Sequence, residues 1–571
     1  MSKITGGKRV GNNLFYYFEE FSIFAGMEAL FANATEIQNI FALITGNKIS
    51  CIDGLIQTLG EANFFLLNPN GIVFEANTSL DLGGSFIATT ANQIDFADEG
   101  NFSVHEEPQE SSTINTPFRL SLNGNTGTIT VNGMGNQVNN RSLLSPITFD
   151  KKPLGLSVKK NKTLALIGNE LNLNSGVVTT EGGDIYLNSL ESGSVEIDRA
   201  KNKLTFLNEN ITSDRDINLD RQSLIYVHGK NRGNISVTGR NINLKDGSFI
   251  FAQNKKNSLR SSIHIKASEN LTLSIQPHSS NINLRSAIRS ETLNTGGGAI
   301  INIFADRLLL QDGARIRTYS FGDGVGGDLN INVANLIQLA SPSSMIATTY
   351  GKGNAGSIYV SASQLNLKLG GISSSTFGEG NGGSIEINAS LIEIEGNFRG
   401  NRGSIAATSW ASGNTGNVKI NTSELRVIEG ASLSSSSFAD GNAGSINISA
   451  SRSIKVIGSQ KISQAGKNPQ STIRAAVQSV SPGAKKAFNL PDIPSGNSGN
   501  IIINTPVLDI ARGGVVTVEN QGRGKAGKLQ INVNSLNLDE AGTITAAGIE
   551  NNGKVTIETN NLSTNKLLSS N

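Results

Sequence analysis

Apolar residues recur at every second position along most of the chain, in short runs that glycine and asparagine interrupt. Ile385, Ile387 and Ala389 form one run, and Ile392 and Ile394 form the next. A spacing of two places alternate side chains on one face of a β-strand. The pattern therefore predicts short strands with one buried face, and helical spacing is nearly absent beyond the first 45 residues.

These runs belong to a repeat that opens on Gly-x-φ-x-φ, where φ is apolar, as at residues 356–360, 383–387 and 444–448. Most copies start about 28 residues after the previous one. Three short strands per copy cannot bury an apolar face alone, whereas stacked copies can. We therefore predict an all-β fold, a right-handed parallel β-helix of the single-stranded, pectin-lyase-like type, with three short strands and about 28 residues per turn. The first apolar residues of the copies are Ile235, Ile263, Ile301, Leu329, Ile358, Ile385, Val418, Ile446, Ile501 and Leu529.

Positions counted back from an aromatic residue near the end of each copy keep their chemistry from one copy to the next. Like side chains stacked about 4.8 Å apart on neighbouring strands would produce such lanes. Large residues occupy one lane, small ones the second and hydroxyl residues the third: Ile316, Met345, Ile372, Ile405 and Leu433; Thr318, Ala347, Ser374, Ala407 and Ser435; Ser320, Thr349, Thr376, Ser409 and Ser437.

Residues 11–96, called the head below, differ from the repeats because they are richer in phenylalanine. They contain the tetrad Asn68-Pro69-Asn70-Gly71 between the apolar runs 64–67 and 72–74. Proline sets its own φ, and asparagine and glycine accept positive φ, so the tetrad by itself predicts a tight turn between two strands.

Six motifs in the head resemble, in order, the filamentous haemagglutinin-type secretion domain at the N-terminus of two-partner secretion (TPS) exoproteins. They lie at residues 11–15, 34–40, 44–46, 52–54, 63–72 and 83–90. The chain departs from the family at residues 74–77, where Phe-Glu-Ala-Asn replaces the usual Phe-Gly-Pro-Asn, and at Cys51, where a small polar residue is usual.

The resemblance implies a head that periplasmic domains of a dedicated outer-membrane TPS transporter recognise while it is unfolded or partly folded. It also implies an extracellular or cell-surface location and an adhesin-like, non-catalytic exoprotein that contacts surfaces or cell-surface polysaccharide. The residues that match the secretion motif are Asn13, Phe15, Asn68, Pro69, Asn70, Gly71 and Ile72.

The changes in pattern predict five parts of the chain. Residues 1–118 would be the TPS secretion domain, 119–195 a transition segment, 196–460 the main repeats, and 499–571 the last turns. The segment between them, 461–498, breaks the repeat and holds four prolines and four lysines, which predicts an exposed insertion.

Composition disfavours several classes of function and site. Charged residues make up 16% of the chain and the formal charge is +2, so no basic surface for nucleic acid is expected. The single cysteine, Cys51, cannot form an intramolecular disulfide, and no spacing of cysteine and histidine predicts a metal site or a cofactor. Residues 1–30 lack the pattern of a secretory signal, and no stretch predicts a membrane span.

The aromatic lane, which comprises Phe321, Tyr350, Phe377, Trp410 and Phe438, leaves two alternatives open. It is either an exposed stripe able to stack on sugar rings or a packing ladder at a corner of the helix.

Two glycine-rich segments are partly similar to known ligand-binding motifs. Residues 522–528 imitate a phosphate loop, but Leu529 stands where the metal-binding hydroxyl residue belongs, so we interpret them as a turn. Residues 322–328 hint at calcium repeats, yet Lys352 follows one turn later and then Glu379, which favours pairing of opposite charges.

A β-helical polysaccharide lyase or hydrolase is the alternative to an adhesin, because fold does not determine function. Such enzymes need carboxylates clustered on adjacent turns. No lane of Asp or Glu runs through three neighbouring copies, which disfavours an enzyme.

Overall fold

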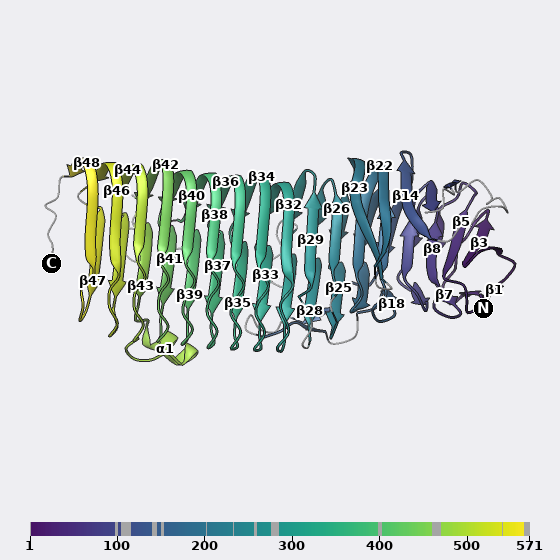
Figure 1. Cartoon of the computed structure of the whole chain (residues 1–571), viewed down its shortest axis with the longest axis horizontal. Coiled ribbons are helices and arrows are strands. Elements are labelled where there is room, and N and C mark those ends of the chain that lie inside the picture. Colours follow the sequence, from purple (N-terminus) through teal and green to yellow (C-terminus); the bar gives the residue numbers. More distant parts are fainter. Residues whose placement is uncertain are drawn as a thin grey trace. The chain divides into compact units, whose positions relative to one another are not determined.

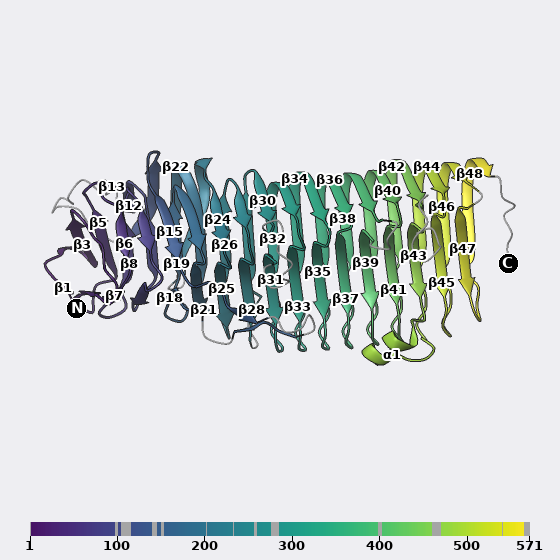
Figure 2. The ribbon, with the colours of Figure 1, turned by 180° about the vertical axis from the view of Figure 1, so that it is seen from behind.

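The computed structural model describes residues 2–96, 101–103, 116–139, 145–149, 153–200, 203–231, 233–255, 260–275, 285–397, 402–459, 470–539 and 541–564. The chain forms two compact units, Met1–Ile288 and Arg289–Asn571. Strands dominate both units, seen from two sides in Figures 1 and 2, and the described residues contain one helix, α1 (Pro482–Phe488). No helix in this part of the chain is long and apolar enough to cross a membrane.

In the second unit, most turns consist of a long bent strand followed by a short strand. Within this unit, long strands pair in parallel with long strands, and short strands with short strands. The long strands are β32 (Ile300–Leu310), β34 (Leu329–Ala340), β36 (Ile358–Lys368), β38 (Ile385–Glu395), β40 (Val418–Ile428), β42 (Ile446–Ile457), β44 (Ile501–Ala511), β46 (Lys528–Leu538) and β48 (Lys554–Thr564). The short strands are β31 (Ala287–Thr292), β33 (Arg315–Ser320), β35 (Ser344–Thr349), β37 (Gly371–Thr376), β39 (Ser404–Ser409), β41 (Ser432–Ser437), β43 (Thr472–Val477), β45 (Val515–Asn520) and β47 (Thr543–Gly548).

The bend of each long strand produces the three predicted sides of a turn. In β38, Ile385 and Ile387 are fully buried before the bend and Ile392 and Ile394 after it, so the inward parity changes between the two arms. The starts of the repeats are register partners, as the pairing of Ile358 with Ile385 shows. The predicted parallel β-helix is confirmed.

The three predicted lanes are also confirmed. Ile372 pairs with Ile405, Ser374 with Ala407, and Thr376 with Ser409. All five large residues of the first lane have no exposed surface. The lanes therefore fill the interior of the second unit with side chains that stack in register.

The first unit has three rows of parallel strands. The first row is β3 (Asn13–Phe18), β5 (Asn39–Ile44), β8 (Asn63–Leu67), β11 (Phe86–Thr89), β19 (Leu164–Gly168), β22 (Ile185–Ala200), β26 (Ile235–Gly239) and β29 (Ser262–Ala267). The second is β6 (Ser50–Ile52), β9 (Ile72–Phe74), β15 (Thr128–Asn132), β20 (Glu170–Asn174), β24 (Ile217–Asp220), β27 (Ile242–Leu244) and β30 (Asn270–Leu273). The third contains β1 (Ser2–Ile4), β4 (Glu28–Phe31), β7 (Leu55–Thr58) and β10 (Ser79–Asp81), then β18 (Leu156–Val158), β21 (Val177–Glu181), β25 (Leu224–Gly229) and β28 (Phe249–Asn254).

Antiparallel strands add a second layer to the head. Strand β14 pairs antiparallel with both β12 and β22, and the distal half of β22 pairs antiparallel with β23. This layer covers the outer side of the first row, because Phe41 and Phe65 share one core cluster with Leu120, Val195 and Phe206. Both faces of β5 are consequently buried, which explains its continuous apolar sequence. The antiparallel strands are β2 (Lys8–Val10), β12 (Gln93–Phe96), β13 (Asn101–Ser103), β14 (Pro117–Asn123), β16 (Val138–Asn139), β17 (Thr148–Phe149) and β23 (Lys203–Asp214).

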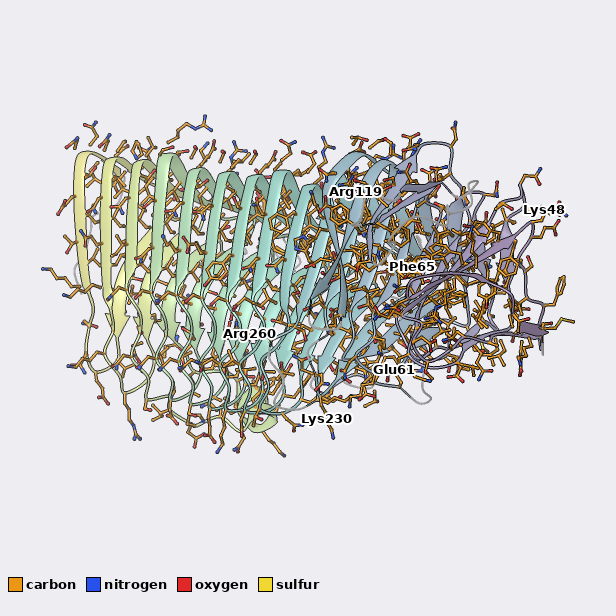
Figure 3. All side chains as sticks on the ribbon, turned by 45° about the vertical axis from the view of Figure 1, so that its right-hand side comes forward. Lys48, Glu61, Phe65, Arg119, Lys230 and Arg260 are labelled. Atoms are coloured by element: carbon orange, nitrogen blue, oxygen red, sulfur yellow. The ribbon has the colours of Figure 1, made fainter. Side chains whose placement is uncertain are left out.

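Figure 3 shows the resulting contrast between the interior and the surface of the head. Phe65 lies among packed side chains and has no exposed surface, whereas Lys48 projects outward. Most aromatic residues of the head are buried in this way, although Phe24 is exposed, and most of its charged side chains lie at the surface.

Part of the predicted insertion, residues 472–477, forms a strand of the β-helix. Thr472–Val477 forms β43, which pairs in parallel with β41 and β45, and Ile473 and Ala475 are fully buried. For these six residues the prediction of an exposed insertion is wrong. The strand was missed because the segments on either side of it carry the prolines and displace it from the regular spacing. Residues 461–469 lie outside the described part of the chain.

Candidate functional site

The tetrad of the head forms a hydrogen-bonded corner between β8 and β9. The buried Asn68 amide donates to the Lys48 carbonyl at 3.0 Å and to Ser50 Oγ at 2.9 Å, and it accepts from the Asn70 backbone at 3.0 Å. Gly71 has φ +125°, and a Cβ there would lie 3.0 Å from the Thr128 carbonyl oxygen. The tight turn predicted from chemistry is confirmed, and it also holds the loop before β6 in place.

Pro69 and Asn70 extend this clamp in two further directions. The Pro69 carbonyl accepts from the Gly127 backbone at 2.7 Å, and the Asn70 amide donates to the Gly46 carbonyl at 2.8 Å. Both side chains are half-buried. They are the part of the tetrad that solvent reaches in the folded head.

Asn13 and Phe15 lie in two interior ladders. Asn39 Nδ2 donates to Asn13 Oδ1 at 2.8 Å, and Asn63 Nδ2 donates to Asn39 Oδ1 at 2.9 Å. The Phe15 ring stacks on Phe41 with centroids 4.9 Å apart, and Phe41 stacks on Phe65 at 4.7 Å. The sequence analysis missed Asn39 and Asn63, although each stands two residues before a phenylalanine, as Asn13 does before Phe15.

Burial limits what the secretion-motif residues do in the folded state. Asn13, Asn68 and Ile72 have no exposed surface, and Phe15 is 1% exposed. A partner that recognises these side chains must therefore meet the chain before this part of it folds.

The aromatic lane forms a continuous stack at the ends of the short strands. Ring centroids are 5.1 Å apart between Phe321 and Tyr350, 5.2 Å between Tyr350 and Phe377, 6.0 Å between Phe377 and Trp410, and 4.3 Å between Trp410 and Phe438. All five residues are half-buried. The lane is a packing ladder whose rings are not fully buried. Contact with sugar rings stays a prediction.

The hydroxyl lane fixes the turn that follows each aromatic residue. Thr349 Oγ1 donates to the Gly353 carbonyl at 2.6 Å, and Thr376 Oγ1 makes the same bond to the Gly380 carbonyl. A Cβ on Gly378 would lie 2.3 Å from the Gly351 carbonyl oxygen, so the stacked turns require glycine there. Burial raises the pKa of the Tyr350 hydroxyl, which keeps this ring neutral.

Helix α1 adds one ring that the sequence analysis missed. The Phe488 centroid lies 4.9 Å from that of Trp410 and 5.8 Å from that of Phe377. Phe488 follows Trp410 by 78 positions (488 − 410) and belongs to no repeat, so no spacing indicated this contact.

The two glycine-rich segments are corners of the helix. The backbone amides of Lys525 and Lys528 donate to Asn497 and Asn500 of the preceding turn at 2.9 and 2.8 Å, so they do not form an open phosphate cradle. Lys352 pairs with Glu379 at 3.8 Å, as expected from alternating charges. The described residues contain no group of three or more side chains suited to a metal ion.

The site and the fold define a parallel β-helix that starts with a head of buried asparagine and phenylalanine ladders. Residues 1–237 match the family model of the TPS secretion domain and belong to that family. The chain is therefore a two-partner secretion exoprotein. Members of this class are secreted and have an outer-membrane transporter as their partner. The match extends beyond residue 118, and the domain boundaries given above stay predictions.

Among solved structures, the chain is similar to the HMW1 secretion domain from Haemophilus influenzae, with 13% sequence identity and a TM-score of 0.27. The alignment covers 98% of this chain and 97% of that one. Comparison with curated proteins finds no match.

Proposed function

We propose that this exoprotein is adhesin-like and that its aromatic lane contacts cell-surface polysaccharide. The observation that carries the proposal is the partly exposed stack of five rings. The faces of these rings stack on one another, so a sugar would place its apolar C–H face against the parts of the rings that stay exposed. Each aromatic contact contributes about 1 kcal/mol. A row of equivalent rings on successive turns suits a polymer, because several weak contacts add together along one chain.

Trp410 makes this proposal directly testable, because it is the only tryptophan in the chain. Titration with capsular or other cell-surface polysaccharide should change its fluorescence. Tyr350→Ala should weaken binding about fivefold, as expected for the loss of one contact of this strength. Tyr359→Ala is the matched control, since Tyr359 is 45% exposed on β36 and lies outside the lane. Equal loss in both variants, or no change of fluorescence in the wild-type protein, would contradict the proposal.

We also propose that the transporter recognises the secretion-motif residues of the head before they fold. The burial of Asn13, Phe15 and Asn68 supports this order of events. When the chain is fused to a signal peptide and expressed with its cognate transporter, Asn68→Ala and Asn70→Ala should reduce secretion. Asn47→Ala, which changes an exposed asparagine outside the six matched motifs, should secrete normally. Unchanged secretion of both tetrad variants would leave the tetrad a purely structural turn.

A further inference from the structure

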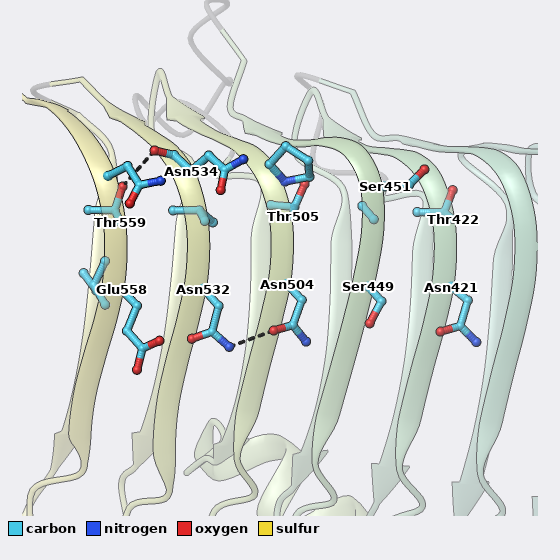
Figure 4. A pocket seen from close by; sticks show the side chains of 15 residues that line it. Asn421, Thr422, Ser449, Ser451, Asn504, Thr505, Asn532, Asn534, Glu558 and Thr559 are labelled. Atoms are coloured by element: carbon cyan, nitrogen blue, oxygen red, sulfur yellow. Dashed lines mark hydrogen bonds between the residues drawn. The ribbon is translucent and has the colours of Figure 1, made fainter.

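A groove lined mainly by polar side chains, with Ala450, Pro506, Val533 and Ile557 among them, runs along the second unit across five successive long strands, from β40 to β48 (Figure 4). One row of its lining residues is Asn421, Ser449, Asn504, Asn532 and Glu558. These five are register partners on adjacent strands, so the row repeats once per turn. The groove lies on the sheet of long strands, whereas the aromatic lane follows the short strands, so the two surfaces are separate.

The amides of this row keep hydrogen-bonding capacity for a ligand. Asn532 Nδ2 donates to Asn504 Oδ1 at 2.7 Å, which uses one of its two N–H groups. Asn532 Oδ1 also accepts from Gln530 Nε2 at 3.3 Å, so one N–H and one oxygen lone pair of this half-buried side chain remain for a ligand. Thr422, Thr505 and Thr559 line the bend beside this row. Their hydroxyl groups donate to backbone carbonyls of the bends, so they offer a ligand only acceptor lone pairs.

The charge of the lining indicates which polymer fits. Glu558 is the only charged residue in it, and the lining contains no lysine or arginine. A polyanion such as nucleic acid or an acidic glycan needs cationic contacts, and it would also meet the Glu558 carboxylate. A polypeptide commonly binds by pairing with a free strand edge, but β42, β44 and β46 are each already paired on both sides.

We propose that this groove is a binding site for a neutral, polyhydroxylated polysaccharide chain that lies parallel to the helix axis. Hydroxyl groups both donate and accept, which matches amide groups that also do both. Five turns at about 4.8 Å per step extend over about 19 Å, which accommodates several sugar units. The site is independent of the aromatic lane and does not rest on the function proposed for it.

Calorimetric titration of the full chain tests the proposal with four probes. These are cellohexaose and maltohexaose as neutral chains, hexagalacturonate as an anionic chain, and a decapeptide of Ser, Thr and Asn. At least one neutral hexasaccharide should bind saturably, and more tightly than its trisaccharide, because the longer chain contacts more turns. Ser449→Arg should weaken this binding at least about tenfold by filling the groove.

Ser361→Arg is the matched control, because Ser361 is an exposed serine of the same row but lies outside the groove. It should leave the affinity within about twofold of the wild-type value. The proposal is overturned if neither neutral hexasaccharide binds, if hexagalacturonate or the decapeptide binds more tightly, or if both serine variants behave alike. Binding that Tyr350→Ala abolishes and Ser449→Arg retains would assign the sugar to the aromatic lane instead, so the two proposals fail separately.

Discussion

At the residue scale, single amide and hydroxyl side chains close the corners of this helix. The backbone of Asn381 donates to Asn354 Oδ1 at 2.9 Å, and that of Asn414 donates to Asn381 Oδ1 at the same distance. The side-chain oxygen of each such asparagine accepts a hydrogen bond from the backbone of the next turn. Loss of one side chain therefore removes the hydrogen-bond partner of a backbone group on the next turn.

Asn68→Ala tests this role in the head. The change leaves the Lys48 carbonyl and the Ser50 hydroxyl without their donor, which costs about 1–3 kcal/mol of local stability. Hydrogen–deuterium exchange at residues 46–52 should accelerate accordingly. Asn12→Ala should leave exchange there unchanged, and equal rates in the two variants would contradict the clamp.

Thr376 tests the hydroxyl lane in the second unit. Thr376→Val keeps the shape of the side chain but leaves the Gly380 carbonyl without its donor, so we expect a loss of about 1–3 kcal/mol in the free energy of unfolding. Thr376→Ser should cost less, because Ser409 makes the same bond one turn later. Denaturant unfolding measures both, and similar losses would show that the hydroxyl group is not what matters.

At the scale of elements, the segment that contains β43 and α1 both completes a turn and supports the aromatic lane. β43 supplies the short strand between β41 and β45. α1 begins at the N-cap Ser481, whose Oγ accepts from the Ala484 backbone at 3.4 Å, and ends at Phe488 beside Trp410. The helix thus shields part of the lane from solvent.

Phe488→Ala should uncover Trp410. Acrylamide should quench its fluorescence more strongly, and the variant should lose about 1 kcal/mol of stability with the aromatic contact. Lys486→Ala, an exposed position on the same helix, is the control. Unchanged quenching in Phe488→Ala would mean that α1 does not cover the lane in solution.

At the scale of the whole molecule, stacking confines each turn's contacts to its neighbours. Ile405 is fully buried and pairs only with Ile372 and Leu433 in its row. In such a stack, stability is a sum of turns and of their interfaces. The effect of a substitution should consequently decline with distance along the helix.

Ile405→Ala should cost about 2–5 kcal/mol and lower exchange protection first in β37, β39 and β41. Protection in the head strands β5 and β8 should not change. Ala406→Ser, on the outward side of the same strand, should leave all protection near the wild-type value. A uniform loss through both units would show a single cooperative structure in place of a local stack.

The sequence by itself determined the parallel helix, the three interior lanes, the tetrad turn and the resemblance to the TPS secretion domain. This was possible because stacking moves each side chain by one strand spacing, so a contact such as Ile372 with Ile405 reappears as a periodic pattern along the chain. The two halves of each long strand could also be predicted, since each has its own alternation of apolar residues.

Contacts that do not follow the sequence repeat could be found only from the tertiary structure. The antiparallel layer brings Val195 and Phe206 over Phe41, and α1 brings Phe488 to Trp410. The partial exposure of the aromatic lane, the shape of the groove and the burial of Asn68 also depend on how the neighbouring strands and loops are arranged in space. Such contacts join segments that are far apart in the sequence and share no repeat, so their energy is set by packing in space and leaves no regular pattern to recognise.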